Sequence, residues 1–319
     1  MQVYDVFNGD ADGICALHQL RLAGPEPGAI LVTGVKRDIR LLDRLVEVRN
    51  ATITVLDISL DSNRASLLQI LAGNRVRYID HHFAGEIPTS ANLEATILPA
   101  PELCTSLIVD NLLAGRHRPW AIVGAFGDNL HAPAQLAAES LSLSGEETTN
   151  LREVGELLNY NSYGKTPTDL YFHPLELYNA VKPYRNPLEF HRDSEVLKKL
   201  RDGFKDDMER ARQTDLFRET AAGRIYLMPD ESWSRRVAGV FMNEKARERE
   251  NQAHALLVDN GDRTLLASIR APLANRTGAD TLCRKFPTGG GRAAAAGVNS
   301  LPERMLEEFI TAFSETFSA

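Results

Sequence analysis

The chain has 319 residues, 43% of them hydrophobic and 25% charged, which is typical of a globular protein long enough for two domains. Its 36 basic and 43 acidic residues give a formal net charge of −7, which excludes a sequence-wide electrostatic grip on long nucleic acid and favours a local basic site. No cationic segment precedes Asp10 and no apolar run reaches about 18 residues, so we expect neither a signal peptide nor a membrane span. Three widely spaced cysteines fit neither a disulfide framework nor a zinc motif, so we expect reduced thiols in a cytoplasmic protein.

The first part of the chain alternates short β-rich runs with helical stretches. This rhythm predicts an α/β domain over residues 1–135, a mostly parallel sheet with flanking helices. The predicted strands are Val3–Phe7, Ile30–Thr33, Ile53–Leu56 and Val76–Ile79, and the predicted helices are Ile14–Leu22, Leu41–Val48 and Arg64–Leu71. Ligands of such sheets bind beyond the carboxyl ends of the strands, so we expect the functional site there.

A helical and highly charged stretch follows, broken by prolines, and it predicts a connector over residues 136–218. Within it, Asn159–Lys165 is either a polar loop, which we favour, or a segment that contacts substrate. Residues 219–319 predict a smaller C-terminal α/β domain. Its expected elements are the strands Arg224–Met228, Ala255–Asp259 and Leu265–Ile269, a Gly-rich stretch Thr288–Gly297 and a closing helix from Pro302 to about Phe317.

Acidic and imidazole side chains follow three of the four N-terminal strands. Asp10 and Asp12 would lie on one face of an extended segment, about 6.6–7 Å apart, where each could bind a hard cation such as Mn²⁺ or Mg²⁺. Asp57 could bridge two cations about 3.5–4 Å apart. Alternation along the chain predicts that His81 and His82 point apart and therefore have different roles.

A fourth acid, Asp128, follows a turn of small residues and could complete the site. Each feature alone has a simpler interpretation. Asp10 could cap a helix, the two histidines could face solvent, and Gly127-Asp128 could be a plain loop. The order of the four segments along one alternating sheet favours the metal site.

Taken in order, Asp10-Ala11-Asp12-Gly13, Asp57, Asp80-His81-His82 and Gly127-Asp128 resemble the four catalytic motifs of the DHH phosphoesterase superfamily. That superfamily includes RecJ-type exonucleases, nanoRNA and pAp phosphatases, cyclic-dinucleotide phosphodiesterases, exopolyphosphatases and one class of inorganic pyrophosphatase. The resemblance implies two Mn²⁺ ions, with Mg²⁺ or Co²⁺ as alternatives. It places Asp10 on one ion, Asp12, His81 and Asp128 on the other, and Asp57 between them. It also implies that His82 contacts the scissile phosphate and that Asp80 supports the histidines.

The first motif departs from the family pattern at two positions. Many members have a histidine where this chain has Val6, and RecJ-like members have an aspartate where it has Asn8. Asn8 could still bind metal through its amide oxygen. Because the amide is neutral, it would hold the first ion more weakly than a carboxylate.

The C-terminal part resembles the DHH-associated domain of nucleotide-handling members. The matching residues are Ser268 and Arg270 at a strand end, and Gly289, Gly290, Gly291, Arg292 and the alanines up to Gly297. Arg292 stands where the family pattern Gly-Gly-Gly-His-x-x-Ala-Ala-Gly has histidine. We expect the glycines to expose N–H groups, the alanine run to begin a helix whose positive end favours phosphate, and both arginines to bind phosphate or a guanine edge. The alternative is a flexible hinge with a solvated arginine.

These features predict a metal-dependent phosphodiesterase that hydrolyses short linear oligonucleotides or dinucleotides such as pGpG to nucleoside monophosphates, using water activated by two metal ions. The alternatives are a cyclic-dinucleotide phosphodiesterase, a pAp phosphatase, or a non-catalytic nucleotide sensor that binds through Arg270 and Arg292 without metal. We expect a small nucleotide partner, no long nucleic acid and no membrane. An exposed edge strand could support a homodimer, although nothing in the sequence requires one.

Overall fold

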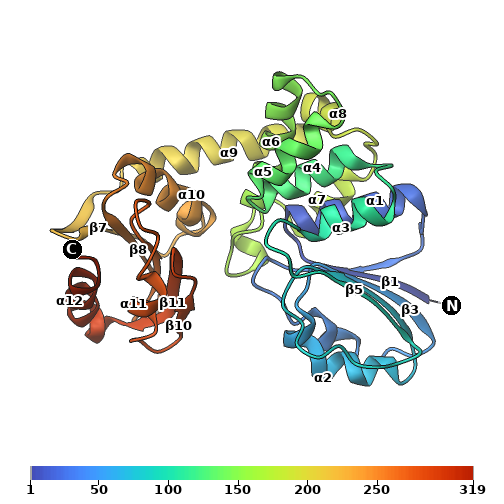
Figure 1. The fold of residues 1–319 in the computed structure, drawn as a ribbon, viewed down its shortest axis with the longest axis horizontal. Helices are drawn as coiled ribbons and strands as arrows, with labels where there is room; N and C mark the ends of the chain where they lie inside the picture. The colour runs from blue at the N-terminus through green and yellow to red at the C-terminus, as the bar shows by residue number, and fades with distance from the viewer. Residues whose placement is uncertain (1, 319) are drawn as a thin grey trace. The chain divides into compact units, whose positions relative to one another are not determined.

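The computed structural model describes residues 2–318, which form two compact units, one ending at Gly203 and the other beginning at Phe204 (Figure 1). Each unit has its own sheet and its own hydrophobic core, which confirms the α/β class. The helices of residues 136–203 lie in the first unit, and residues 204–218 lie in the second. No helix of the described residues is long and apolar enough to cross a membrane.

The first unit contains a five-stranded parallel sheet in the order β2-β1-β3-β4-β5. Its strands are β1 (Gln2–Phe7), β2 (Ile30–Val32), β3 (Ala51–Leu56), β4 (Arg75–Asp80) and β5 (Leu93–Ile97). The four predicted strands are confirmed, and β5 was not predicted. After β1 the chain passes to β2 on one side and then crosses to β3 on the other side of β1, and ligands bind at such switch points in parallel sheets.

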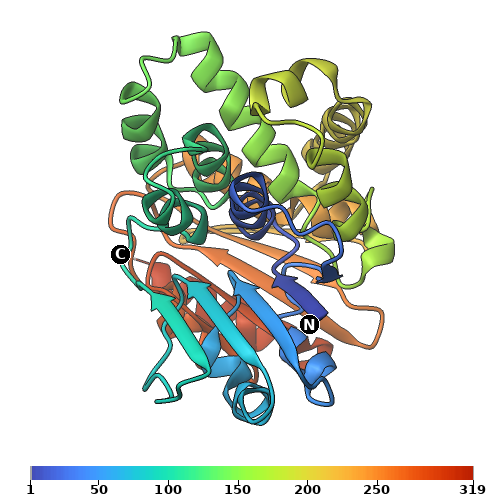
Figure 2. The same cartoon turned by 90° about the vertical axis from the view of Figure 1, so that its right-hand side faces the viewer.

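Helices cover both faces of this sheet (Figures 1 and 2). The helical elements along this part of the chain are α1 (Ala11–Ala23), η1 (Leu41–Leu45), α2 (Leu60–Leu71), α3 (Thr105–Leu112), α4 (Arg118–Gly127), α5 (His131–Glu139), α6 (Gly145–Tyr160), η2 (Pro167–Asp169), α7 (Pro174–Val181), α8 (Pro187–Asp193) and α9 (Glu195–Arg212), the last of which continues past Gly203 into the second unit. The leucines of η1 and α2 join the core beneath one face, while α1 packs with α3, α4 and α6 on the other. The helix expected over Leu41–Val48 is instead a short 3-10 helix.

The small residues before Asp128 do not form the expected turn. They lie in the last turn of α4, where their size allows neighbouring helices to approach. A Cβ at Gly124 would lie 2.2 Å from Oγ of Ser106 in α3 and 3.3 Å from Oδ1 of Asp12. The segment is therefore a helix-packing surface that brings α3 and α4 close to Asp12.

The second unit contains a six-stranded mixed sheet in the order β10-β11-β9-β8-β7-β6. Its elements are β6 (Leu216–Thr220), β7 (Gly223–Met228), α10 (Ser232–Glu248), β8 (Ala253–Asp259), β9 (Thr264–Arg270), α11 (Ala279–Cys283), β10 (Gly289–Gly291), β11 (Ala295–Pro302), η3 (Glu303–Met305) and α12 (Leu306–Phe317). Phe286, Phe309 and Phe313 join the strand residues in its core. The three predicted strands and the closing helix are confirmed.

The alanine run after the glycines does not begin a helix, so the prediction of a helix with a phosphate-binding end is wrong. Ala293 and Ala294 lie between the two strands, and Ala295 and Ala296 begin β11. Its residues pair with β9, with Ala296 opposite Ile269 and Gly297 opposite Ser268. This pairing overrides the helix propensity of alanine. The Arg292–Ala295 turn joins β10 to β11, with Arg292 N–H donating to the Ala295 carbonyl at 2.9 Å.

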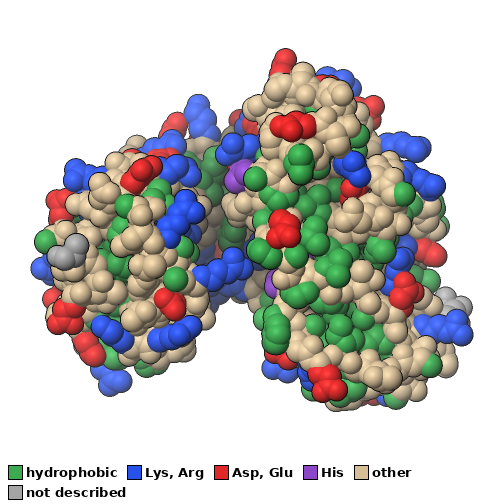
Figure 3. Space-filling view, in the orientation of Figure 1, with side chains coloured by type: hydrophobic (Ala, Val, Ile, Leu, Met, Phe, Trp, Pro, Cys, Tyr) green, Lys and Arg blue, Asp and Glu red, His purple; other side chains and the backbone are tan. Residues whose placement is uncertain are grey.

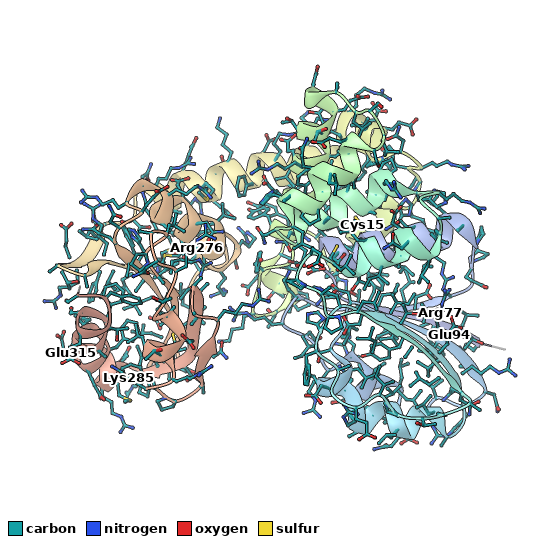
Figure 4. All side chains as sticks on the ribbon, viewed as in Figure 1. Cys15, Arg77, Glu94, Arg276, Lys285 and Glu315 are labelled. Carbon is teal, nitrogen blue, oxygen red and sulfur yellow. The ribbon has the colours of Figure 1, made fainter. Side chains whose placement is uncertain are left out.

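Charged side chains of both signs are interspersed over the visible face of each unit (Figure 3). Arg77 of β4 and Glu94 of β5 form one such pair, with Nε and Oε1 3.3 Å apart (Figure 4). The second unit carries Lys285 and Glu315 in the same mixed pattern (Figure 4). The mixture agrees with the small negative net charge and gives this face no continuous basic stripe.

Candidate metal centre

The predicted ligands come together at the carboxyl end of the first sheet. Asp10 follows β1, Asp57 follows β3 and Asp80 ends β4, and all three are buried. Asp12 is also buried, in the first turn of α1. Asp128 comes from the end of α4 rather than from a strand. Segments far apart in the sequence therefore place five carboxylates in one region.

Asp10 and Asp12 do not lie on an extended segment, because α1 begins between them. Asp10 is the N-cap, and its Oδ1 accepts a hydrogen bond from the N–H of Gly13 at 3.0 Å. Its Oδ2 lies 2.6 Å from Nζ of Lys36. Burial opposes ionisation of Asp10, but the charge and hydrogen bond of Lys36 outweigh it and lower its pKa. The capping interpretation is thus correct, and the carboxylate still has a second, charged partner.

Asp12 binds the start of α3. Its two oxygens accept the N–H groups of Thr105 at 2.8 Å and Ser106 at 2.7 Å. Hydroxyl Oγ of Ser106 donates to the Asp12 carbonyl at 2.8 Å. The positive end of α3 and these N–H groups favour the charged carboxylate and fix its position.

Asp57 lies in the left-handed region, with a φ of 58°, directly after β3. Its N–H still donates to the Ile79 carbonyl at 3.1 Å, so the backbone turns without losing its link to β4. Thr105 Oγ1 donates to Asp57 Oδ1 at 3.2 Å. Burial, followed by the charges of the other four acids, raises the pKa of Asp57 well above its usual range. A nearby cation would offset this unfavourable burial of the carboxylate.

The two histidines lie just beyond the end of β4, with ring centroids 4.4 Å apart. The prediction that they point apart is therefore wrong, because the strand alternation ends at Asp80. They still have different partners. His81 Nδ1 donates to the Leu103 carbonyl at 3.0 Å, and its Nε2 lies 3.4 Å from Asp57 Oδ1 and 3.9 Å from Asp128 Oδ2. Since a carbonyl only accepts, His81 has its Nε2 lone pair available for a metal.

His82 is held by Asp80. Its Nδ1 lies 2.7 Å from Asp80 Oδ1. Burial opposes the charged ring, but the hydrogen bond and charge of Asp80 outweigh it and raise the pKa of His82. The His82 side chain is 43% exposed, so its outer edge can reach a bound molecule.

Lys36 and Asp128 complete the charge pattern. The ammonium lies 3.7 Å from Asp128 Oδ1. Burial and the charge of Asp12 raise the pKa of Asp128 to about 6, although Lys36 acts in the opposite direction. Burial disfavours the charged form of Lys36, but Asp10 outweighs it and raises the pKa of this lysine well above its usual value.

The donors present fit a hard divalent cation. Two sets of side chains place their ligand atoms within 4.8 Å of one another, Asp12 with His81 and Asp128, and Asp57 with His81 and His82. Carboxylate and imidazole donors suit Mn²⁺ or Mg²⁺. Asn8 Oδ1 is buried and accepts no hydrogen bond within the described residues, so this oxygen is available as a metal ligand.

No protein-family model matches the chain, and no curated protein matches its sequence. Solved structures match nearly all of it. A DHH-domain protein described as a member of a family of ribosomal proteins matches with a TM-score of 0.63 at 13% identity, covering 98% of this chain and 86% of its own. Exonuclease RecJ bound to manganese matches with a TM-score of 0.64 at 15% identity, covering 98% and 89%. This chain has the DHH-domain fold.

A third DHH-fold neighbour is the pGpG-specific phosphodiesterase PggH from Vibrio cholerae. Its TM-score is 0.53 at 12% identity, and the match covers 99% of this chain and 100% of that one. At these identities the likeness concerns the fold. The roles of individual residues therefore depend on the geometry described above.

In the C-terminal unit of this DHH fold, the residues predicted to bind substrate lie on β9 and on β10 with its following turn, and β11 runs between these two strands. Ser268 pairs with Gly297, and Arg270 pairs with Ala295. Arg270 Nε donates to Asn243 Oδ1 at 2.9 Å. Arg292 lies exposed at the β10–β11 turn.

The first glycine of the motif has a packing reason for its size. A Cβ at Gly289 would lie 1.8 Å from the Cys283 carbonyl oxygen at the end of α11. Gly290 has nothing within 4 Å. The glycine run is therefore an edge strand pressed against a helix end rather than the flexible hinge considered as an alternative.

Several partners of the acidic cluster are not predicted from the sequence, among them Ser106. Lys36, Thr105 and Asn159 each contact a predicted ligand or its neighbour, and each comes from a segment without a recognisable motif. Asn159 belonged to the polar segment Asn159–Lys165, which begins at the end of α6 and continues as the loop we favoured. Its run of amides and phenols was the only sequence signal for these contacts.

Proposed function

We propose that the chain is a metal-dependent phosphoesterase acting on short linear oligonucleotides or dinucleotides, with nucleoside monophosphates as products. The observation that carries the proposal is the convergence of Asp10, Asp12, Asp57, His81 and Asp128 at the switch point of a parallel sheet. Buried carboxylates repel one another, and an uncharged ligand would not offset this repulsion. The site suits a cation that in turn binds a phosphate.

The chemistry supplied by a bound divalent cation would be charge withdrawal from the phosphoryl oxygens and a lower pKa of the attacking water. Asp12, His81 and Asp128 would hold the cation, with Asp57 beside them. The N–H groups at the start of α3 fix Asp12, and the Leu103 carbonyl fixes the ring of His81. The ligands are therefore oriented before the cation binds, which reduces the cost of binding.

His82 would stabilise the phosphate during reaction. Asp80 holds Nδ1 and favours the protonated ring, so the remaining N–H of His82 can donate to a phosphoryl oxygen that gains negative charge. Because a charged donor strengthens as this charge develops, His82 would contribute more to the transition state than to substrate binding.

Arg270 and Arg292 are proposed to bind the phosphate or base of the substrate away from the scissile bond. The planar guanidinium group can make two parallel hydrogen bonds to phosphate oxygens or to a guanine edge. The turn that carries Arg292 is fixed by two backbone hydrogen bonds between Arg292 and Ala295. A small substrate agrees with the net charge of −7 and with the mixed surface charge. Manganese is the proposed cation, and cytoplasm the proposed location.

The test is hydrolysis of a panel of phosphate compounds with Mn²⁺, with Mg²⁺ and with chelator. The panel contains pGpG, pApA, a pentanucleotide, a long single strand, cyclic di-GMP, pAp and pyrophosphate. The Asp57→Ala variant removes the buried carboxylate beside the cation, and Asp206→Ala, which removes an exposed acid of α9, is the control. We expect metal-dependent turnover of the short linear compounds in the wild type and the control, and none in Asp57→Ala.

A nucleotide sensor is the competing function, and the neutral side chain of Asn8 is the observation that favours it. A sensor would bind pGpG equally well with metal or with chelator and would hydrolyse nothing in the panel. That result would overturn the proposed activity. Turnover of cyclic di-GMP or pAp alone would keep a phosphoesterase and refute the short linear substrate.

A further inference from the structure

The Lys36 ammonium lies beside Asp10, the carboxylate that the family resemblance puts on the first metal ion. Lys36 Nζ lies 2.6 Å from Asp10 Oδ2, 3.2 Å from Asn159 Oδ1 and 3.7 Å from Asp128 Oδ1. Its oxygen neighbours thus come from the start of α1, the end of α6 and the end of α4. The ammonium therefore has oxygen neighbours from three elements, as a bound metal ion would have.

The polar segment after α6 holds Lys36 in this position. The N–H of Lys36 donates to the Ser162 carbonyl at 3.1 Å. Its Nζ lies 5.6 Å from the centre of the Tyr163 ring, a distance suited to a cation–π contact. The Tyr163 hydroxyl accepts from Asn159 Nδ2 at 3.2 Å, which leaves Asn159 Oδ1 for the ammonium. Backbone, amide and ring therefore all fix the lysine.

Within residues 2–318, the side chains that could bind a metal ion lie around His81 and not around Asp10. Both sets found among the described residues share His81, and neither includes Asp10. The carboxylate expected to hold the first ion is instead paired with Lys36 and with the N–H of Gly13. The other residue expected near that ion, Asn8, is neutral.

We propose that this centre holds one divalent cation, bound by Asp12, His81 and Asp128, and that the Lys36 ammonium takes the place of the first ion, which the family resemblance puts on Asp10. The inference rests on the proposed function only in taking the cluster to be a metal site. Lys36 and one divalent ion bring three positive charges to the carboxylates of Asp10, Asp12, Asp57 and Asp128. A second ion would have to approach an ammonium that already occupies its carboxylate, and like charges a few ångströms apart repel strongly in a partly buried site.

The ammonium would act on the substrate differently from a metal ion. It can donate hydrogen bonds to a phosphate oxygen and offset its charge, but it lacks the open coordination positions of a metal. In this centre Lys36 would therefore bind and stabilise the phosphate, while a single cation serves the attacking water.

The experiment counts the ions directly. The metal-free protein is dialysed against increasing Mn²⁺, the bound metal is measured by mass spectrometry, and the electron paramagnetic resonance spectrum of the loaded protein is recorded. We expect one Mn²⁺ per wild-type chain and the six-line spectrum of an isolated ion. Lys36→Ala, which frees Asp10, should bind two ions with an exchange-coupled spectrum. Lys198→Ala, which removes an exposed lysine of α9, should behave as the wild type.

The outcomes separate this inference from the proposed function. Two coupled ions in the wild type would overturn the single-ion centre even if short oligonucleotides are hydrolysed. One isolated ion with no hydrolysis would keep the single-ion centre and overturn the activity. If Lys36→Ala fails to fold, shown by loss of its cooperative thermal transition, the wild-type count and spectrum still decide. A wild type that binds no ion refutes both.

Discussion

Asp57 shows how the function of a residue can oppose stability. Its carboxylate is buried beside four other acids, which raises its pKa and destabilises the metal-free protein once it ionises. We expect Asp57→Asn to raise the thermal midpoint of the metal-free protein at pH 7 and to weaken Mn²⁺ binding, because the site loses a negative charge beside the cation. Calorimetry with and without Mn²⁺ checks both effects. A variant that is less stable without metal would contradict the electrostatic explanation.

His82 and Asp80 should differ in what they contribute. If His82 donates to the phosphate, His82→Ala should lower kcat by about 10²–10³-fold while Mn²⁺ still binds. Asp80→Asn keeps the ring but weakens its support, and we expect a loss of about 10–100-fold. The pH profile distinguishes the two variants from general damage, because Asp80→Asn should lower the pKa of His82 and move the alkaline limb to lower pH. An unchanged profile would argue against the His82–Asp80 pair.

Asp128 should make metal affinity depend on pH. Its pKa is raised to about 6 in the metal-free protein, so it is protonated below that pH and charged above it. A protonated carboxyl cannot ligate, so the affinity for Mn²⁺ should fall about tenfold per pH unit below 6. Isothermal titration between pH 5 and 8 measures this. Asp128→Asn should bind more weakly and lose this component of the slope.

The same raised pKa has a consequence for stability without metal. The unfolded carboxyl ionises near 3.8 and the folded one near 6, so the folded state binds more protons between these values. Stability therefore declines as the pH rises through this interval, by at most about 3 kcal/mol from Asp128.

At the residue scale, the predictable part of the site is the part encoded in short motifs. The acids at the ends of β1, β3 and β4 could be located because they follow β-rich runs. Lys36 could not be located in this way, because its position in the site depends on a contact with Asn159. That residue lies 123 residues away in the sequence and reaches Lys36 only in the folded chain. Thr105 is hidden for the same reason.

At the scale of elements, the glycine run of β10 offers a matched pair of substitutions. A Cβ at Gly289 would collide with a backbone carbonyl, whereas one at Gly290 would enter open space. We expect Gly289→Ala to lower the free energy of unfolding of the second unit by about 1–3 kcal/mol and Gly290→Ala to have little effect. Urea unfolding measures the difference. Equal effects would show that the packing of β10 against α11 is not what requires glycine.

Local pattern predicted elements well where it agreed with tertiary pairing. The buried parallel strands were identified because their apolar runs are flanked by helical patterns. The alanine run was misassigned because alanine favours helix in isolation, while pairing with β9 decides its conformation. Strand β5 is not predicted, because its residues are at most half buried and its sequence has no clear alternation of apolar and polar residues.

At the scale of the whole molecule, each unit has one of the two tryptophans, Trp120 in α4 and Trp233 in α10. Because the metal ligands all belong to the first unit, Mn²⁺ should stabilise that unit by about 2.7 kcal/mol at a free concentration 100 times the Kd and leave the second unchanged. Trp233→Phe and Trp120→Phe variants report the two units separately by fluorescence. An equal shift in both variants would mean that the units unfold together.

The three cysteines are buried, and burial raises the pKa of each thiol; for Cys15 and Cys104 the charge of Asp12 adds to the effect. Cys15 lies on α1 (Figure 4), and Cys104 immediately precedes α3, so both border the acidic cluster. A protonated, enclosed thiol reacts with an alkylating reagent only when the surrounding structure opens. The alkylation rates of these two cysteines therefore measure how often the centre opens, and the measurement requires neither an introduced label nor a substrate.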